Sequence, residues 1–112
     1  MKLITAVVKP DRLDDVIQAV IDGGGDGLTV TEVRGFGQQY GHRGHVRPAQ
    51  TRALVVAKLR VDAVVQDEAA EAVVDAIAKA VNTGSIGDGK IWVSPVESVL
   101  RVRTGDRDQD AL

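Results

Sequence analysis

The sequence predicts an α+β fold with the element order βαββαβ, in which one antiparallel sheet carries two helices on one of its faces. Three observations predict it. Two segments have apolar residues at helical spacing, and both stop at glycine. Each of these segments has a strand-like segment before it and another after it. The second half repeats the order of the first, which is the arrangement of the ferredoxin-like fold.

Size and composition point to a single domain spanning residues 1–112. The 14 Lys and Arg residues against 16 Asp and Glu leave a net charge of −2, so there is no basic footprint for direct nucleic-acid binding. The chain has no cysteine, which excludes disulfides and thiolate metal sites. The apolar run before Lys9 is too short for a signal peptide or a membrane span, so we expect a cytoplasmic protein.

The first half contains a strand, a helix and a second strand. Residues 3–8 form an apolar, β-branched run that predicts a buried strand. Asp11 is the predicted N-cap of a helix that ends at three consecutive glycines, residues 23–25. Alternation from residue 28 onward predicts a strand that runs into Gly35-Phe36-Gly37. The apolar face of the helix consists of Leu13, Val16, Ile17, Val20 and Ile21.

The second half begins with a long loop, because residues 38 to about 53 have no usable period, and alternation resumes at Lys58. Residues 58–63 predict a strand, and Asp67 is the predicted N-cap of a second helix that ends before Gly84. Residues 91–93 and 99–103 predict a fourth strand region, interrupted near Pro95. We expect the acidic tail, about 104–112, to be flexible.

The sheet face without helices is expected to be buried against other copies of the chain. Both helices cover one face of a small sheet, and the opposite face still carries many apolar positions. A closed oligomer covers such a face, so the sequence predicts a homo-oligomer.

The segment Gly84-Ser85-Ile86-Gly87-Asp88-Gly89-Lys90 has the glycines and the lysine of a phosphate-binding loop at matching spacing. Ile91 stands where that loop needs a Ser or Thr, and the segment leads from a helix into a strand instead of the reverse. We therefore reject a nucleotide-triphosphatase loop. Successive glycines can still expose backbone N–H groups to an anion beside Lys90, with an ordinary turn as the alternative.

Three separate segments could supply a polyphosphate cleft. Gly35-Phe36-Gly37 ends one predicted strand, and Arg101 and Arg103, two residues apart on another, should point the same way. Together with Lys90 they would surround an anion, although the spacing alone favours an ordinary solvated strand face for the arginines. No catalytic arrangement is visible, so we expect no enzyme activity. A slow ATPase using Lys90 and Arg103 is the weaker alternative, and we disfavour a metal site at His42 and His45.

Residues 83–93, Thr-Gly-Ser-Ile-Gly-Asp-Gly-Lys-Ile-Trp-Val, resemble the C-terminal signature of the PII signal-transduction proteins, also called nitrogen regulatory protein P-II. The resemblance covers the whole chain, including Lys9-Pro10, residues 29–37, Lys58 and residues 101–105. It implies a homotrimer of ferredoxin-like subunits with ATP or ADP in each cleft between neighbours. It also implies a role in nitrogen, carbon and energy signalling.

The resemblance also implies the site residues. A magnesium ion would bridge ATP and the effector 2-oxoglutarate at Gln39, and Lys58 would pair with the distal carboxylate of that effector. The positions implied for the nucleotide are Val7, Thr29, Gly35, Phe36, Gly37, Gln38, Asp62, Val64, Gly87, Asp88, Gly89, Lys90, Arg101 and Arg103. Those implied for 2-oxoglutarate are Gln39, Tyr40, Gly41, Lys58 and Gly87.

The loop from 38 to about 57 corresponds to the T-loop of these proteins, which contacts ammonium transporters, nitrogen-metabolism enzymes and regulators. Arg47 and Thr51 would contact such partners, and a membrane would be reached only indirectly through a transporter. The loop also departs from the family pattern, because Thr51 replaces the tyrosine that is nucleotidylated. Gln38 and Tyr40 replace an arginine and a lysine. The alternative hypothesis is therefore a divergent regulator with altered effector or target specificity and no nucleotidylation at position 51.

Overall fold

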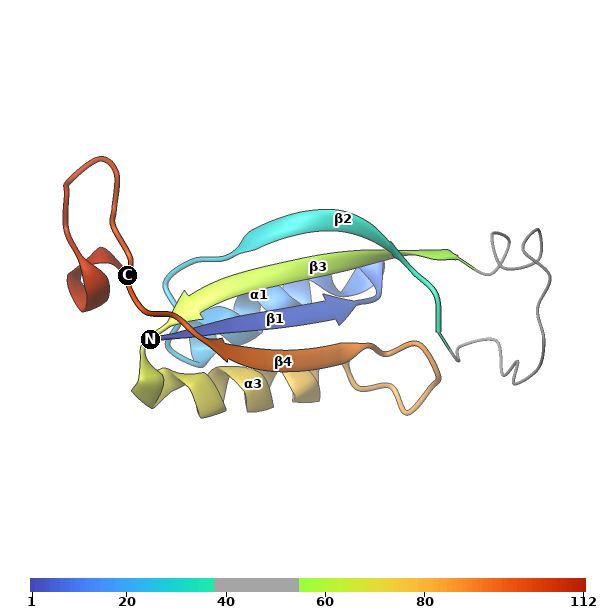
Figure 1. Ribbon diagram of the computed structural model, residues 1–112. Coiled ribbons are helices and arrows are strands. Elements are labelled where there is room, and N and C mark those ends of the chain that lie inside the picture. Colours follow the sequence, from blue (N-terminus) through green and yellow to red (C-terminus); the bar gives the residue numbers. More distant parts are fainter. Residues whose placement is uncertain (38–54) are drawn as a thin grey trace.

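The structure is a computed structural model that describes residues 1–37 and 55–112. Its strands pair in the order β2-β3-β1-β4, every neighbouring pair is antiparallel, and the two longer helices lie on one face of the sheet (Figure 1). The predicted ferredoxin-like order is confirmed. The elements are β1 Lys2–Val8, η1 Pro10–Arg12, α1 Leu13–Asp22, β2 Thr29–Gly35, β3 Val56–Val65, α3 Asp67–Val81, β4 Lys90–Pro95 and η3 Asp108–Ala111.

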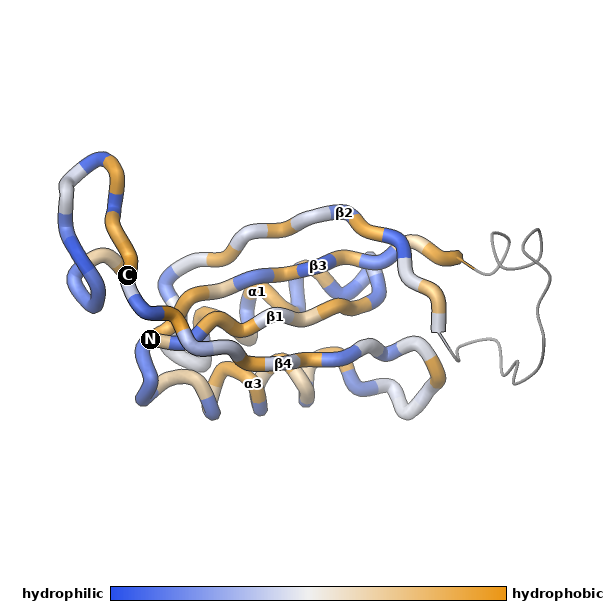
Figure 2. Tube along the Cα trace, viewed as in Figure 1, coloured by the Kyte–Doolittle hydropathy of each residue, from blue (hydrophilic) through white to orange (hydrophobic). Residues whose placement is uncertain are grey.

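The core lies between the sheet and the two helices. Alternate residues of the central strands β1 and β3 point to the helices, and their apolar side chains are buried there. Figure 2 shows the polar residues of α3 on its turns away from the sheet, as expected for a helix with one buried face. The core residues are Ile4, Ala6, Val8, Val16, Ala19, Val20, Leu59, Val61, Ala63, Val65, Val73, Ile77 and Val81.

The two predicted N-caps are wrong. Asp11 lies inside η1, and α1 starts at Leu13 with Arg12 at its N-cap. Asp67 is the first residue of α3, after Gln66 at the N-cap, and its carboxylate lies 2.8 Å from the amino group of Met1. Neither N-cap side chain makes a capping hydrogen bond. Acidic residues still lie in both first turns, where they complement the helix dipole.

The predicted glycine stop of α1 is confirmed, and it has a second role in packing. Gly24 adopts φ +98°, and the amide of Gly25 donates to the carbonyl of Val20 at 2.8 Å, which closes the helix in a Schellman arrangement. A Cβ atom on Gly23 would lie 2.7 Å from the Cα of Val73. The missing side chain at Gly23 therefore allows α1 to approach the backbone of α3.

We expect Gly23→Ala to lower the free energy of unfolding by about 1–3 kcal/mol, because the new methyl group forces the backbones of α1 and α3 apart. Urea unfolding followed by circular dichroism measures the change. Gly27→Ala is the matched control, since no atom lies within 4 Å of a Cβ at that position. Equal stability of the Gly23 variant and the control would contradict this view of the helix contact.

The fourth strand is shorter than predicted. β4 ends at Pro95, and the amide of Val96 donates to the carbonyl of Met1 as the chain leaves the sheet. Residues 99–108 instead turn back on themselves, with a bridge between Leu100 and Arg107. Arg101 and Arg103 therefore do not share a strand face. We expected a flexible tail at about 104–112; its flexibility stays a prediction, but its backbone contains a turn and the short helix η3.

The predicted loop at 38 to about 57 is also shorter at its C-terminal end. Val56 already belongs to β3 and pairs with Gly35, and Ala57 pairs with Arg34. Residues 38–54 lie outside the described part of the chain. In Figure 1 the end of β2 and the start of β3 lie at the end of the sheet opposite to the C-terminal turn. No helix within residues 1–37 and 55–112 is long and apolar enough to cross a membrane.

Candidate functional site

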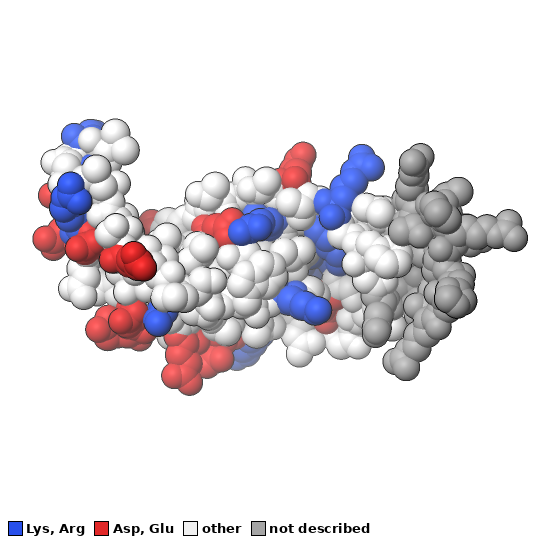
Figure 3. Space-filling model, viewed as in Figure 1, with Lys and Arg blue, Asp and Glu red and all other residues white. Residues whose placement is uncertain are grey.

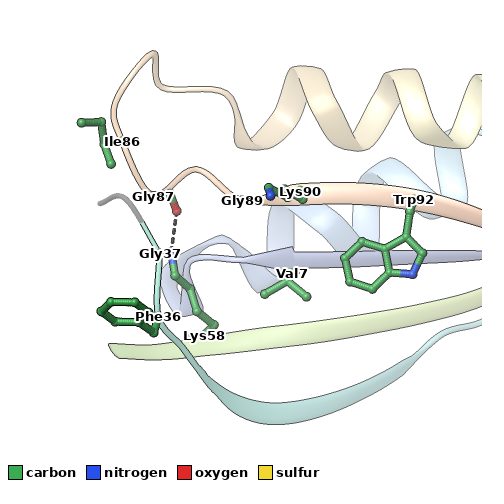
Figure 4. A pocket seen from close by; sticks show the side chains of 10 residues that line it. Val7, Phe36, Gly37, Lys58, Ile86, Gly87, Gly89, Lys90 and Trp92 are labelled. Atoms are coloured by element: carbon green, nitrogen blue, oxygen red, sulfur yellow. Dashed lines mark hydrogen bonds between the residues drawn. The ribbon is translucent and has the colours of Figure 1, made fainter. Parts of the chain in front are cut away.

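A cavity of about 530 Å³ lies where β2 and β3 approach the residues outside the described part. The end of β2, the glycine turn before β4 and the open face of the sheet meet there (Figure 4). The structure thus brings together two glycine segments and two lysines that are far apart in the sequence. The lining residues are Val7, Gly35, Phe36, Gly37, Lys58, Ile86, Gly87, Gly89, Lys90 and Trp92.

Residues 84–89, called the glycine turn below, have a backbone conformation that strongly favours glycine. Gly87 and Gly89 adopt φ +99° and φ +110°, in the left-handed region. A Cβ on Gly89 would lie 1.9 Å from the carbonyl oxygen of Val7, so the turn packs backbone against backbone on the end of β1. This close approach holds the turn against the end of β1, and Gly87 and Gly89 line the cavity together with Lys90.

Lys58 brings a nearly buried ammonium group into the cavity. The residue is 9% exposed, and its Nζ donates to the carbonyl of Gly87 at 2.5 Å (Figure 4). Burial and, to a smaller extent, the charge of Lys9 lower the pKa of Lys58, while Asp88 acts in the opposite direction. An ammonium has three donors, so Lys58 can also bind an anion that enters the cavity.

Asp88 lies outside the cavity lining, although the resemblance implied it for the nucleotide. Its carboxylate accepts hydrogen bonds from the amides of Thr83 at 2.7 Å and Gly84 at 3.0 Å. It also accepts from the Thr83 hydroxyl and from Lys9 Nζ, the latter at 3.2 Å. The Thr83 bonds and Lys9 hold the pKa of Asp88 well below its usual range. The structure thus places this side chain inside the turn.

The remaining predicted nucleotide positions lie elsewhere. Thr29, Asp62, Val64 and Arg101 line a second cavity of about 400 Å³. It lies at the start of β1 and the end of β3, whereas the first cavity lies at the opposite ends of these strands. Arg103 lines neither cavity. The predicted convergence of Lys90, Arg101 and Arg103 is therefore wrong within one chain, because residues 99–103 leave the sheet.

The carboxylate of Asp62 accepts hydrogen bonds from residues of its own sheet. The hydroxyl of Thr5, a fully buried residue, donates to Asp62 at 2.7 Å, and Arg60 Nε donates at 3.0 Å. Burial acts to raise the pKa of the Asp62 carboxyl, but the bonds from Thr5 and Arg60 together outweigh it and leave the pKa below its ordinary value. The carboxylate therefore stays ionised at neutral pH.

Thr5→Val removes one of these donors, so we expect the pKa of Asp62 to rise. A carboxyl whose pKa is lowered on folding stabilises the protein above its unfolded pKa, near 3.9, and loses this effect as the pH falls through its folded pKa. In the variant, the loss of stability on acidification should therefore be smaller and should be complete at higher pH, because the folded pKa of Asp62 lies closer to the unfolded one. Titration of the carboxyl carbon of Asp62 by NMR measures the shift. An unchanged titration would contradict a role for Thr5.

Positive charge accompanies the first cavity. On the face shown in Figure 3, several Lys and Arg side chains lie over the half of the sheet away from the C-terminal turn, whereas most acidic side chains lie toward that turn, together with further Lys and Arg side chains. Lys58 and Lys90 line the cavity itself, and Lys9 lies close enough to Lys58 to affect its pKa. An anionic ligand is therefore favoured at this end of the molecule.

The sequence did not predict two of the residues that line the first cavity, and several predicted residues lie outside the described part of the chain. Trp92 follows Lys90 by two positions on β4, so strand alternation could have revealed it, and Ile86 lies within the glycine motif itself. In the described ranges, no three His, Cys, Asp or Glu side chains cluster to hold a metal. The predicted positions outside those ranges are Gln38, Gln39, Tyr40, Gly41, Arg47 and Thr51, together with His42 and His45.

Comparison with known proteins shows the family of this chain. The family model for nitrogen regulatory protein P-II matches residues 1–106. Nitrogen regulatory protein P-II of Rhizobium meliloti (strain 1021) is 49% identical over 112 residues. Nitrogen regulatory protein GlnK of Escherichia coli (strain K12) and nitrogen regulatory protein P-II of Azospirillum brasilense are both 45% identical over the same length. Each alignment spans 100% of both chains, so this protein belongs to the nitrogen regulatory protein P-II family.

Proposed function

We propose that this P-II family member is a signal-transduction protein that binds ATP or ADP with Mg²⁺ and senses 2-oxoglutarate. It passes this state to an ammonium transporter or to nitrogen-metabolism enzymes and regulators through the loop between β2 and β3. The observation that carries the proposal is the first cavity, where two glycine segments meet Lys58 and Lys90. Sensing requires unequal binding of the ligand to two loop conformations, and the loop starts directly at this cavity.

The residues present fit a polyphosphate and a dicarboxylate. The backbone of the glycine turn and the ammonium of Lys90 suit the phosphate groups. Lys58 suits a carboxylate, and the resemblance assigns Gln39 to the bridging magnesium ion. No lining residue of the cavity in the described part is a carboxylate or an imidazole that could position water, which favours a sensor over an ATPase.

The separation of the two cavities supports a homotrimer. Lys90 and Arg101 are both expected at the phosphates of one nucleotide, yet they lie at opposite ends of the subunit. A cyclic assembly would bring the second cavity of one subunit to the first cavity of its neighbour. The open sheet face, with Trp92 43% exposed beside the partly exposed Val7, would be covered in the same assembly.

A divergent regulator is the second candidate, and the loop sequence favours it. Gln38 and Tyr40 replace two cationic residues that the family pattern places near the ligands, and Thr51 replaces the modified tyrosine. A hydrogen bond to a charged group contributes about 1.5–3 kcal/mol, so affinity for the γ-phosphate or for 2-oxoglutarate could fall about tenfold or more.

Calorimetry separates the two candidates. The purified protein is titrated with Mg-ATP, with ADP in parallel, and the ATP-loaded protein is then titrated with 2-oxoglutarate. We expect 2-oxoglutarate to bind only when Mg-ATP is present. Binding of ATP without 2-oxoglutarate would favour the divergent regulator, and failure to bind either nucleotide would reject both. Light scattering on the same sample should give the mass of three chains.

A further inference from the structure

We propose that Lys9, Thr83, Gly84 and Asp88 form a clamp that holds the glycine turn in the shape that receives phosphate, so that Asp88 is a positioning residue. The ligand of this inference rests on the proposed function. The clamp itself rests on contacts between residues of the chain. It gives Asp88 an indirect role and brings Lys9, which lines no part of the cavity, into the site.

The carboxylate of Asp88 has no acceptor position to spare. Its Oδ2 accepts from the amides of Thr83 and Gly84, and its Oδ1 accepts from the Thr83 hydroxyl and from Lys9. A carboxylate has about four lone-pair sites, and these four donors occupy them. A direct bond from Asp88 to a nucleotide or to its magnesium ion would therefore require one of the four to be given up.

The turn needs such a clamp because glycine restrains the chain least. Gly84, Gly87 and Gly89 all adopt positive φ, and each has many other conformations available when it is not held. The hydrogen bonds of Asp88 with Thr83 and Gly84 connect the start of the turn to its end. Through Lys9, it ties the turn to the end of β1, next to the place where Gly89 packs on Val7. The turn is thus fixed at both of its ends.

Lys58 makes the clamp necessary during ligand binding. In the free chain, Lys58 also holds the turn through the carbonyl of Gly87. In the proposed function Lys58 turns toward the effector, and its bond to the turn is weakened or lost. The clamp is then what keeps the turn in place. Lys9 therefore holds the turn, while Lys58 is free to exchange between the turn and the ligand.

The clamp is tested with Asp88→Asn and Lys9→Met in the full-length protein. The matched control is Asp15→Asn, which removes an exposed carboxylate that accepts from Arg12 at 3.4 Å, away from both cavities. Hydrogen exchange of the amides of residues 83–89 reports the shape of the turn without any ligand. Fluorescence of Trp92, the one tryptophan of the sequence, reports titration with Mg-ATP and with adenosine, which has no phosphate.

We expect Asp88→Asn to speed exchange of the Thr83 and Gly84 amides tenfold or more, and to weaken Mg-ATP binding tenfold or more. Adenosine affinity should change less than twofold, because the nucleoside does not use the turn. Lys9→Met should show the same pattern with smaller size, Lys9→Arg should restore binding to within threefold, and Asp15→Asn should change nothing. The double variant Lys9→Met, Asp88→Asn should match Asp88→Asn alone, because Lys9 acts through that carboxylate.

Three results would overturn the clamp: exchange at residues 83–89 that is unchanged in Asp88→Asn, an equal loss of adenosine and Mg-ATP affinity, or additive effects in the double variant. If Asp88→Asn does not fold, Lys9→Met and Thr83→Val carry the same test. If the unmodified protein binds no Mg-ATP, the proposed function fails while the exchange measurement still decides whether the clamp exists.

Discussion

Gly89→Ala is expected to lower the free energy of unfolding by at least about 3 kcal/mol and to abolish ligand binding. A Cβ at this position would lie 1.9 Å from the carbonyl oxygen of Val7, and the residue has φ +110°. The clash is with backbone, so no side chain can move aside to relieve it. The end of β1 and the start of β4, where Val7 pairs with Lys90, would have to separate.

Two other glycines turn this expectation into a graded series. Gly84 has φ +77° with open space around its Cβ position, so Gly84→Ala should cost about 1 kcal/mol from the backbone conformation alone. Gly27 has neither constraint, and Gly27→Ala should change stability by less than about 1 kcal/mol. Urea unfolding gives the order of stability. A Gly89 variant as stable as the Gly84 variant would mean that the turn can move away from β1.

Lys58→Met is expected to weaken 2-oxoglutarate binding about 10- to 100-fold while the protein stays folded. The variant loses a charged hydrogen bond and leaves a ligand carboxylate unpaired, and the loss of such a bond typically costs about 1.5–3 kcal/mol. Methionine has a similar length and an apolar stem, which suits a residue that is 9% exposed. The variant also removes a buried charge, because burial and, to a smaller extent, the charge of Lys9 lower the pKa of Lys58.

Arg60→Met is the control for this experiment. Arg60 lies two positions further along β3 on the same face, pairs with Asp62 and lines neither cavity. Calorimetry of the ATP-loaded variants with 2-oxoglutarate should show the loss for Lys58→Met and not for Arg60→Met. Unchanged 2-oxoglutarate affinity in the Lys58 variant would place the carboxylate elsewhere. An equal loss of ATP affinity would assign Lys58 to the nucleotide.

The local patterns of the sequence predicted the elements well. The spacing of Val16 and Val20, and of Val73 and Ile77, predicted both buried helix faces, and the glycines after α1 predicted its end. These signals are local, because a residue's burial in a helix or a strand follows from a period of a few positions. The glycine turn before β4 was recognised for the same reason, since Gly84, Gly87 and Gly89 adopt positive φ and such a backbone favours glycine.

The partners of the polar side chains were not predictable in this way. Asp11 and Asp67 have the residue type of a cap, yet neither occupies a cap position. Alternation put Arg101 and Arg103 on a strand, but the chain leaves the sheet after Pro95 and takes Arg101 to the second cavity. The resemblance implied that Asp88 contacts the nucleotide, but in the fold its carboxylate accepts hydrogen bonds from Thr83, Gly84 and Lys9.

The difference has one physical cause. Apolar burial depends on area and is non-directional, so a periodic row of Val, Ile and Ala suffices to specify which faces of the helices and strands meet. A hydrogen bond or an ion pair requires two particular atoms within about 3 Å, and Lys9 and Asp88 are 79 positions apart in the chain. The order of the elements and the glycine turns therefore follow from sequence pattern, whereas the clamp on the turn and the separation of the two cavities follow from how the sheet brings distant residues together.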